Sequence, residues 1–249
     1  MAERRQPVPS WHHAPVTTVA IIGRGRGAAL HAETIRMTRG VELVGVSGRA
    51  PGPAGALSEA LGVPERPRRE LIAAAEAVIV AVPPRAVSEV LSEIPVQQPT
   101  LVESPVGAVD LDPAARNALD RPRSMVAVNL LHAPIVRRGL RAITELGDVH
   151  HLVLRARTPS AADRVADVGA GVLLDPMAQL LPVLLAAAGE PLTAVSARVD
   201  RDHRGHDVAA RLELRLADDR TVLADLAWAD STAHADVEAA SAQGVVALT

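Results

Sequence analysis

Residues 16–28 read Val-Thr-Thr-Val-Ala-Ile-Ile-Gly-Arg-Gly-Arg-Gly-Ala, and they carry the strongest indication of fold class in the chain. Its β-branched apolar start predicts a buried strand, and the residues that follow have helical composition. Between the two, Gly23, Gly25 and Ala28 form a G-x-G-x-x-A pattern. In this context the first glycine permits a tight turn, the second lets a diphosphate approach the backbone, and the alanine permits close helix–strand packing. The alternative is an ordinary glycine-rich turn.

Short apolar runs alternate with helical segments up to residue 128. Further strands are expected at 41–46, 77–82, 100–102 and 125–128, and further helices at 54–61, 70–75, 87–94 and 113–119. This alternation predicts parallel strands joined by right-handed crossovers, with helices on both faces of the sheet.

After Asn129 the pattern changes. Helices are expected at 135–146 and 173–188, a strand at 151–157, and three alternating runs at 193–199, 208–216 and 221–228. Leucine alternates with Arg and Glu in residues 211–216, which predicts a sheet with one buried and one wet face. Residues 200–207 read as a polar hairpin tip, and Asp218-Asp219 suits a turn.

The predicted fold class is α/β. A tail is expected at 1–15, a doubly wound Rossmann domain with a parallel sheet at 16–128, and a smaller α+β domain with a mainly antiparallel sheet at 129–249.

The end of the second strand bears on the cofactor. An NAD site usually has an acid there for the ribose hydroxyls, but this chain has Ser47-Gly-Arg49. A guanidinium can pair with a 2′-phosphate, so NADP is preferred and NAD stays possible. The alternative is that Arg49 is only a solvated loop residue. The predicted cofactor contacts are Gly23, Arg24, Gly25, Arg26, Gly27, Ala28, Ser47, Arg49, Val82, Pro83 and Glu103.

Composition excludes several classes of protein. The 249 residues contain no Cys, which removes disulfides, thiolate metal sites and Cys nucleophiles. The net charge is -3, and Phe and Tyr are absent, which argues against nucleic-acid binding. Every basic residue is Arg, so no Lys or Tyr can act as a proton donor. No metal site is predicted.

The chain resembles the Gfo/Idh/MocA family of NAD(P)-dependent oxidoreductases from about residue 18 to about residue 190. The resemblance rests on the order and spacing of short pieces: Gly23-x-Gly25-x-x-Ala28-x-x-His31, Val41-Glu-Leu-Val-Gly-Val46, Ala60-Leu-Gly-Val-Pro64, Ala77-Val-Ile-Val-Ala-Val-Pro-Pro84, Leu101-Val-Glu-Ser-Pro105, Asn129 with Pro134, and Gly171-Val-Leu-Leu-Asp175. It implies a Rossmann domain, a second α/β domain with an open sheet that often mediates oligomers, and a cis peptide before Pro105.

The chain departs from the family pattern at two polar positions. The family's Glu-Lys-Pro motif is Glu103-Ser104-Pro105 here, and its Asp-x-x-x-His pair is Asp175-Pro-Met-Ala-Gln179. Ser104 and Gln179 do not titrate near neutral pH. Asp175, which the resemblance places in the cleft, is therefore the first candidate for handling a proton. His132 is the second, with a loop or packing role as its alternative. The predicted catalytic set is Asp175, His132, Ser104 and Gln179.

These features predict an NADP-dependent oxidoreductase acting on a small carbonyl, imine or hydroxyl substrate. Two alternatives stay open because the family Lys and His are replaced. One is a redox-neutral lyase, isomerase or cyclase, and the other is a non-catalytic partner subunit. The expected compartment is the cytoplasm, with no nucleic-acid or membrane partner. A homodimer or higher oligomer is expected to form through the carboxy-terminal sheet.

Overall fold

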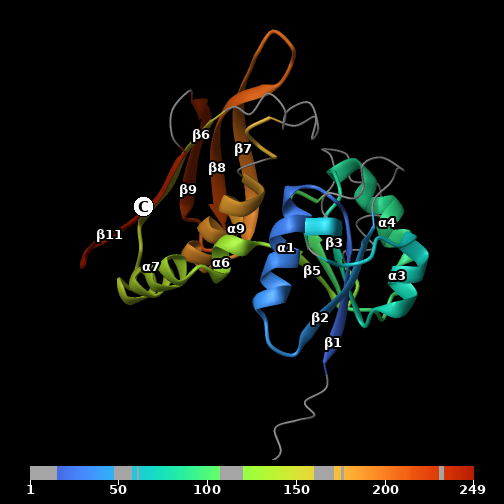
Figure 1. The fold of residues 1–249 in the computed structure, drawn as a ribbon. Helices are drawn as coiled ribbons and strands as arrows, with labels where there is room; N and C mark the ends of the chain where they lie inside the picture. Colours follow the sequence, from blue (N-terminus) through green and yellow to red (C-terminus); the bar gives the residue numbers. More distant parts are fainter. Residues whose placement is uncertain are drawn as a thin grey trace, which may run out of the picture. The chain divides into compact units, whose positions relative to one another are not determined.

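The computed structural model describes residues 16–47, 58–60, 62–106, 120–159, 171–174, 177–229 and 233–249 (Figure 1). The described residues form two compact units. The first takes in residues up to Val82, together with Val90–Leu101 and Asp120–Met125. The second takes in Pro83–Glu89, residues 102–106 and the chain from Val126 onward. The predicted domain boundary after residue 128 stays a prediction.

The first sheet is parallel, with its strands in the order β2-β1-β3-β4-β5. Its strands are β1 (Thr17–Ile22), β2 (Val41–Ser47), β3 (Ala77–Val80), β4 (Thr100–Glu103) and β5 (Ser124–Ala127). The accompanying helices are α1 (Arg26–Met37), α3 (Arg68–Ala74), the 3-10 turn η1 (Pro84–Ala86) and α4 (Val87–Glu93). The chain leaves β1 for β2 on one side and returns to β3 on the other, so the strand order reverses beside β1.

Helices cover both faces of this sheet, with α1 on one side and α3 on the other (Figure 1). Residues 19–22 of β1 are buried in succession, as expected for a strand enclosed on both faces. Ala28, Ala32 and Ile35 of α1 pack in one core cluster with Val19 and Ile21 of β1. The predicted strands and helices of this half are confirmed with boundary shifts of one or two residues where the structure describes them.

Some predictions for the first half fall outside the described residues. These are the tail at 1–15, the helix at 113–119 and most of the helix at 54–61, of which residues 58–60 are described and helical. The cis peptide bond between Ser104 and Pro105, which the family resemblance implied, is present.

The second sheet has the order β11-β10-β6-β9-β8-β7. Its strands are β6 (His151–Pro159), β7 (Leu192–Arg201), β8 (Asp207–Leu216), β9 (Thr221–Ala229), β10 (His234–Ser241) and β11 (Gly244–Leu248). The pair β6–β9 is parallel and the other neighbouring pairs are antiparallel, so the predicted mainly antiparallel sheet is confirmed. Helices α6 (Asn129–His132), α7 (Pro134–Glu145) and α9 (Met177–Ala188) accompany this sheet.

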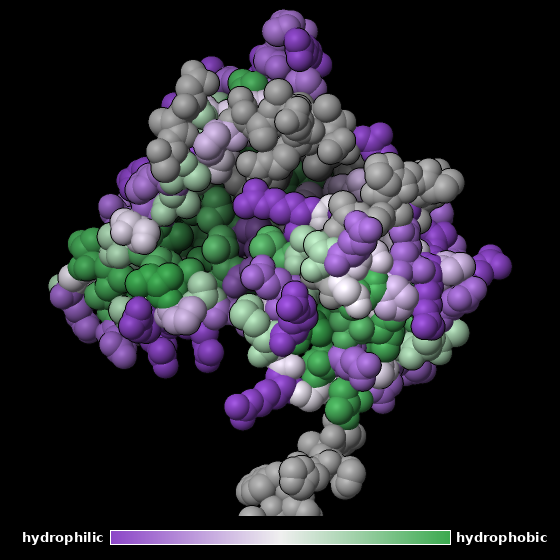
Figure 2. Space-filling view, viewed as in Figure 1, coloured by the Kyte–Doolittle hydropathy of each residue, from purple (hydrophilic) through white to green (hydrophobic). Residues whose placement is uncertain are grey.

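One face of the second sheet carries the core of its unit. Leu212, Leu214 and Leu216 of β8 are buried in a cluster with residues of α7 and α9, while the intervening Arg and Glu side chains are exposed. The predicted alternation is therefore confirmed. Figure 2 shows hydrophobic side chains over α7 and β11, where Ile135 is 54% and Val245 is 66% exposed.

Three features of this half differ from the sequence prediction. Strands β10 and β11 were not expected. The Ala, Asp and Glu residues of β10 have low strand propensity, and pairing with β6 holds this strand extended, while the short strand β11 pairs with β10. The four-residue helix α6 is too short to show a period. Helix α9 begins at Met177 rather than 173, because the Val172 N–H donates to the Asp207 carbonyl oxygen and residues 172–174 form a turn.

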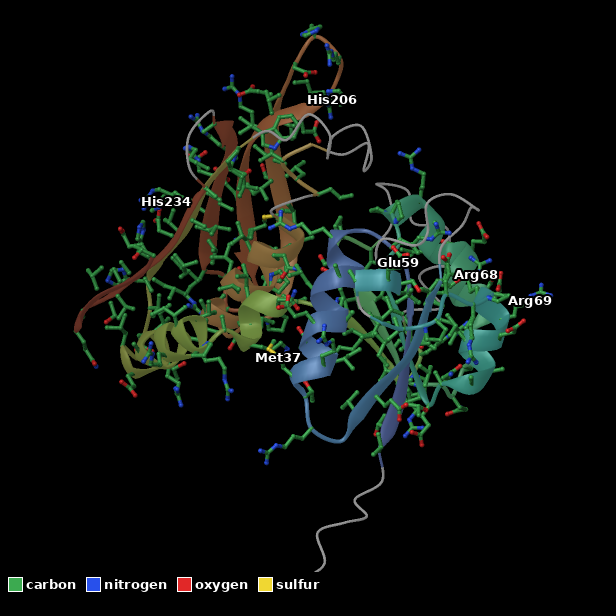
Figure 3. All side chains as sticks on the ribbon, viewed as in Figure 1. Met37, Glu59, Arg68, Arg69, His206 and His234 are labelled. Atoms are coloured by element: carbon green, nitrogen blue, oxygen red, sulfur yellow. The ribbon has the colours of Figure 1, made fainter. Side chains whose placement is uncertain are left out.

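The predicted hairpin tip lies between β7 and β8, and Figure 3 shows His206 there. The Asp202 carboxylate accepts the backbone N–H groups of His206 and Arg204 at 2.9 and 2.8 Å, and its other oxygen lies 3.2 Å from His206 Nδ1. These contacts, with the His206 N–H as the largest, lower the pKa of Asp202. The tip is therefore a turn stabilised by hydrogen bonds among its own residues.

In the part of the chain that the structure describes, no helix is long and apolar enough to cross a membrane.

Candidate functional site

The turn after β1 lies at the reversal of strand order, where open α/β sheets bind ligands. The Gly23 N–H donates to the Ser47 carbonyl oxygen at 2.7 Å, and the Ala81 N–H donates to the Ile22 carbonyl oxygen at 2.8 Å. The turn is therefore fastened to the ends of β2 and β3. Gly23 has φ of 150°, and a Cβ atom there would lie 2.1 Å from the Ala81 oxygen. Packing within the protein alone requires glycine at this position.

The structural reason for having glycine differs between positions 23 and 25. Gly25 is the N-cap residue of α1, with φ of -75° and ψ of -175°, which any residue can adopt. A Cβ atom at Gly25 would meet nothing within 4 Å. Neither the backbone nor the packing of the described residues requires glycine here. A side chain at this position would instead occupy open space directly before the helix.

The first turn of α1 presents free backbone donors beside that space. The first helical hydrogen bond runs from the Ala29 N–H to the Gly25 oxygen at 3.1 Å, so the N–H groups of Arg26, Gly27 and Ala28 have no acceptor within the helix. No side chain caps this end, and the first turn contains no acidic residue. The dipole of α1 adds partial positive charge. The space before α1 is thus lined by donors that suit an anion.

Ala28 sits on the opposite side of the same turn. It is fully buried and lies in one cluster with Ile21 of β1 and Val46 of β2. A larger side chain would push the start of α1 away from the sheet. The small residue therefore fixes how closely the donor groups of α1 approach the ends of the strands.

Arg24 points toward a residue that the sequence analysis did not single out. Its Nη2 atom lies 2.9 Å from Oε1 of Glu65, and the two side chains are 25% and 28% exposed. Glu65 belongs to a short segment that pairs with the end of β2. No sequence signal links residues 24 and 65, because only the sheet brings them together.

The other predicted cofactor contacts are placed as follows. Ser47 is the last residue of β2 and is buried. Val82 and Pro83 follow β3, and Glu103 ends β4, so these residues lie at or beyond the carboxyl ends of parallel strands. Arg49 lies outside the described residues. A cofactor role for each of these residues stays a prediction.

Three of the four predicted catalytic residues lie in described parts of the chain, and two of these three lie on neighbouring helices. Ser104 follows β4 directly, in the second unit, and Asp175 lies outside the described residues. Gln179 and His132 lie on α9 and α6, which pack against each other. His132 is an exposed residue at the last position of α6. The structure thus places Gln179 and His132 on neighbouring helices.

Gln179 has an unusual environment. It is the only polar residue of α9, whose other residues are Met, Ala, Leu, Pro and Val. Its Nε2 atom donates to the carbonyl oxygen of Ala127, at the end of β5, at 2.9 Å. Its Oε1 atom is buried and accepts no hydrogen bond from the described residues. Buried acceptors without donors are rare in folded proteins, so this oxygen is suited to accept a hydrogen bond from a ligand.

Comparison with known proteins bears on this arrangement. Residues 18–106, less than half of the chain, match the family described as NADP oxidoreductase, coenzyme F420-dependent. No curated protein matches the chain.

Solved structures match over nearly the whole chain. GenD2 from gentamicin A biosynthesis, in complex with NAD, is 22% identical with a TM-score of 0.83, and the match covers 97% of this chain and 75% of that chain. The scyllo-inositol dehydrogenase from Lactobacillus casei with bound NAD(H) and scyllo-inositol is 16% identical, with a TM-score of 0.78 and coverage of 94% and 76%. A myo-inositol dehydrogenase from Corynebacterium glutamicum is 20% identical, with a TM-score of 0.77 and coverage of 93% and 74%.

The architecture is therefore a parallel sheet of the Rossmann type followed by an open, mainly antiparallel sheet. More particularly, it is the two-domain fold of Gfo/Idh/MocA-type NAD-dependent dehydrogenases. The resemblance stated from the sequence is confirmed at the level of the fold.

Proposed function

We propose that this protein is an NADP-dependent oxidoreductase that transfers hydride between the nicotinamide and a small carbonyl, imine or hydroxyl substrate. The observation that carries the proposal is the open space at Gly25, where the protein's own packing does not require glycine. A diphosphate needs close approach to the backbone at this position of a Rossmann turn. The N–H groups of residues 26–28 would donate to its oxygens.

The preference for NADP rests on charge at the carboxyl end of β2. Ser47-Gly-Arg49 supplies a hydroxyl and a guanidinium where an acid would favour NAD. Arg24 and Arg26 add positive charge in the turn after β1. The structural neighbours named above include proteins described with NAD, so NAD is the second candidate.

The bound cofactor would supply or accept a hydride, and the chain's residues would bind and orient the substrate. Gln179 is held by Ala127 with its Oε1 free to accept a hydrogen bond. A substrate hydroxyl or N–H group would satisfy this oxygen. The amide stays neutral at all ordinary pH values, so it orients without exchanging a proton. Proton transfer would fall to Asp175 or His132, as the sequence analysis proposed.

A redox-neutral reaction is the second candidate. It is favoured by Ser104 and Gln179, which replace the two titrating groups of the family motif with groups that do not titrate near neutral pH. Product formation without a change in nicotinamide absorbance would distinguish this reaction from hydride transfer.

Cofactor binding tests the leading proposal. Titration of the purified protein with NADPH, followed by nicotinamide fluorescence, is expected to show saturable binding. Gly25→Ala is expected to weaken binding by about tenfold or more, because its methyl group enters the diphosphate space. Its melting temperature should match that of the wild type, since the backbone angles of Gly25 allow alanine. Absence of binding by the wild type, or equal binding by Gly25→Ala, would contradict the proposal.

A further inference from the structure

A short segment extends the first sheet beyond β2. Glu65 forms a parallel bridge with Val46. The Val46 N–H donates to the Pro64 oxygen at 3.2 Å, and the Arg66 N–H donates to the Val46 oxygen at 3.3 Å. Gly45 makes this approach possible, because a Cβ atom there would lie 2.7 Å from the Pro64 oxygen. The fold therefore holds Glu65 beside the carboxyl end of β2.

Arg24, in the turn after β1, also lies beside the carboxyl end of β2. It follows Gly23, whose N–H is bonded to the Ser47 oxygen at the end of β2. The contact of 2.9 Å between Arg24 Nη2 and Glu65 Oε1 therefore spans the end of β2. Both side chains are about three-quarters buried, at 25% and 28% exposure, so solvent screens the pair less than it screens an exposed pair.

The end of the second strand is the place where dinucleotide folds read the adenosine ribose. An acid there accepts hydrogen bonds from the ribose hydroxyls of NAD, and a cation there binds the 2′-phosphate of NADP. The sequence places no acid at the end of β2 itself. The tertiary structure supplies one, Glu65, already paired with a cation, Arg24.

We infer that the Arg24–Glu65 pair sets the choice between NADP and NAD at the ribose 2′ position. This inference rests on the proposed function, because it assumes a dinucleotide in the turn after β1. Arg24 is the cation that receives the 2′-phosphate. Glu65 holds Arg24 in place and also repels that phosphate, so it moderates the preference for NADP and offers an acceptor to the free hydroxyls of NAD.

The test compares dissociation constants of NADPH and NADH, measured by fluorescence titration at one ionic strength. Glu65→Gln removes the negative charge that lies against Arg24 and near the 2′-phosphate, so the ratio of the NADH to the NADPH constant should rise by roughly five- to tenfold. Arg24→Gln removes the phosphate partner, so the same ratio should fall by about tenfold. The double variant should lie between the wild type and Arg24→Gln, because it lacks the phosphate partner but also lacks the Glu65 charge that repels the phosphate.

A second ion pair of the same unit provides the matched control. Arg68 on α3 bonds Glu93 on α4, and the two side chains are 26% and 23% exposed (Figure 3 shows Arg68). Glu93→Gln breaks an ion pair that is buried to a similar extent as Arg24–Glu65 but does not lie at the end of β2. It should leave the cofactor ratio unchanged while lowering stability to a similar extent as Glu65→Gln.

The outcomes separate this inference from the proposed function. If the wild type binds neither dinucleotide, both are overturned. If it binds but Glu65→Gln and Arg24→Gln weaken NADPH and NADH equally, or leave the ratio unchanged, the pair has only a structural role and this inference alone is overturned. Should Glu65→Gln fail to fold, Arg24→Gln by itself decides, because an unchanged ratio in that variant contradicts the inference.

Discussion

Gly23 and Ala81 meet backbone to backbone, and a Cβ atom on Gly23 would lie 2.1 Å from the carbonyl oxygen of Ala81. The φ of 150° at Gly23 is also unfavourable for any other residue. Gly25, two positions along, has neither restriction. The two glycines of one motif therefore have separate tasks, since Gly23 permits the fold and Gly25 leaves open space.

The first prediction separates these tasks by stability. Gly23→Ala should lower the free energy of unfolding by roughly 3 kcal/mol, from backbone strain and forced displacement of β3. Gly25→Ala should change it by less than about 1 kcal/mol. Urea denaturation followed by circular dichroism measures both variants. Equal stability of Gly23→Ala and wild type would show that the turn can relax without cost.

The second prediction concerns the buried amide of Gln179. Gln179→Glu places a carboxylate oxygen against the Ala127 carbonyl oxygen, in a site with a buried acceptor that already lacks a donor. The variant should be less stable than the wild type at pH 7 by roughly 2–3 kcal/mol.

The pH dependence of this loss has a definite sign. Burial and the nearby carbonyl should raise the pKa of the new carboxyl group in the folded state above its unfolded value of about 4.3. The deficit should then shrink as the pH falls toward 4, because the protonated acid can donate to Ala127. Gln179→Met, which has similar length and no charge, serves as the control and should show no such pH dependence. A deficit that stays constant between pH 4 and pH 8 would contradict the prediction.

The third prediction concerns Arg220, which fastens three segments together. Its Nη1 donates to the Val149 oxygen at 3.0 Å and its Nη2 donates to the Ala188 oxygen, at the end of α9, at 2.8 Å. Arg220→Ala should destabilise the protein by roughly 2–3 kcal/mol. Arg215→Ala is the control, because its side chain is 62% exposed and its ion-pair partner Asp219 is 85% exposed. Thermal unfolding should show a clear loss for the first variant and almost none for the second.

A fourth prediction follows from the partner of Arg220 in the same turn. The side-chain hydrogen bond from Arg220 lowers the pKa of Asp218 below its usual 3.8. A carboxyl group with a lowered folded pKa stabilises the fold above its unfolded value and stops doing so as the pH falls through the folded value. The stability difference between wild type and Asp218→Asn should therefore be present at pH 6 and shrink as the pH falls below 3.8 and through the lowered folded pKa. A difference that persists in strong acid would show that packing, rather than charge, is responsible.

The oligomer expected from the carboxy-terminal sheet stays a prediction, and its open face gives it a testable form. Cross-strand ion pairs line this face, such as Arg155 with Asp236 at 3.1 Å and Arg157 with Asp225 at 3.2 Å. An interface on so charged a surface should weaken as salt increases. Light scattering should show Arg211→Glu shifted toward the monomer. Arg69→Glu, the same charge change at a side chain 89% exposed on α3, should not shift it. A wild type that is monomeric at every salt concentration would make the prediction wrong.

The sequence alone determined those features that depend on local spacing. The unbroken apolar run of β1, the glycines after it and the start of α1 predicted a Rossmann turn, because strand burial, tight turns and helix ends depend on residues only a few positions apart. The alternation in β8 predicted a half-buried sheet for the same reason. Strand β10 was missed, since its Ala-rich sequence forms a strand by pairing with β6, which is distant in the chain, and β11 was missed with it as the hairpin partner of β10.

Contacts between residues far apart in the chain could be found only in the folded protein. Glu65 reaches Arg24 because its segment pairs with β2 across a glycine, and Gln179 reaches Ala127 because α9 packs beside α6 at the end of β5. Neither contact leaves a periodic or compositional signal, since each joins side chains whose separation along the chain is arbitrary. The contacts of the candidate functional residues therefore depend on sheet pairing and helix packing, which the local sequence does not encode in a readable pattern.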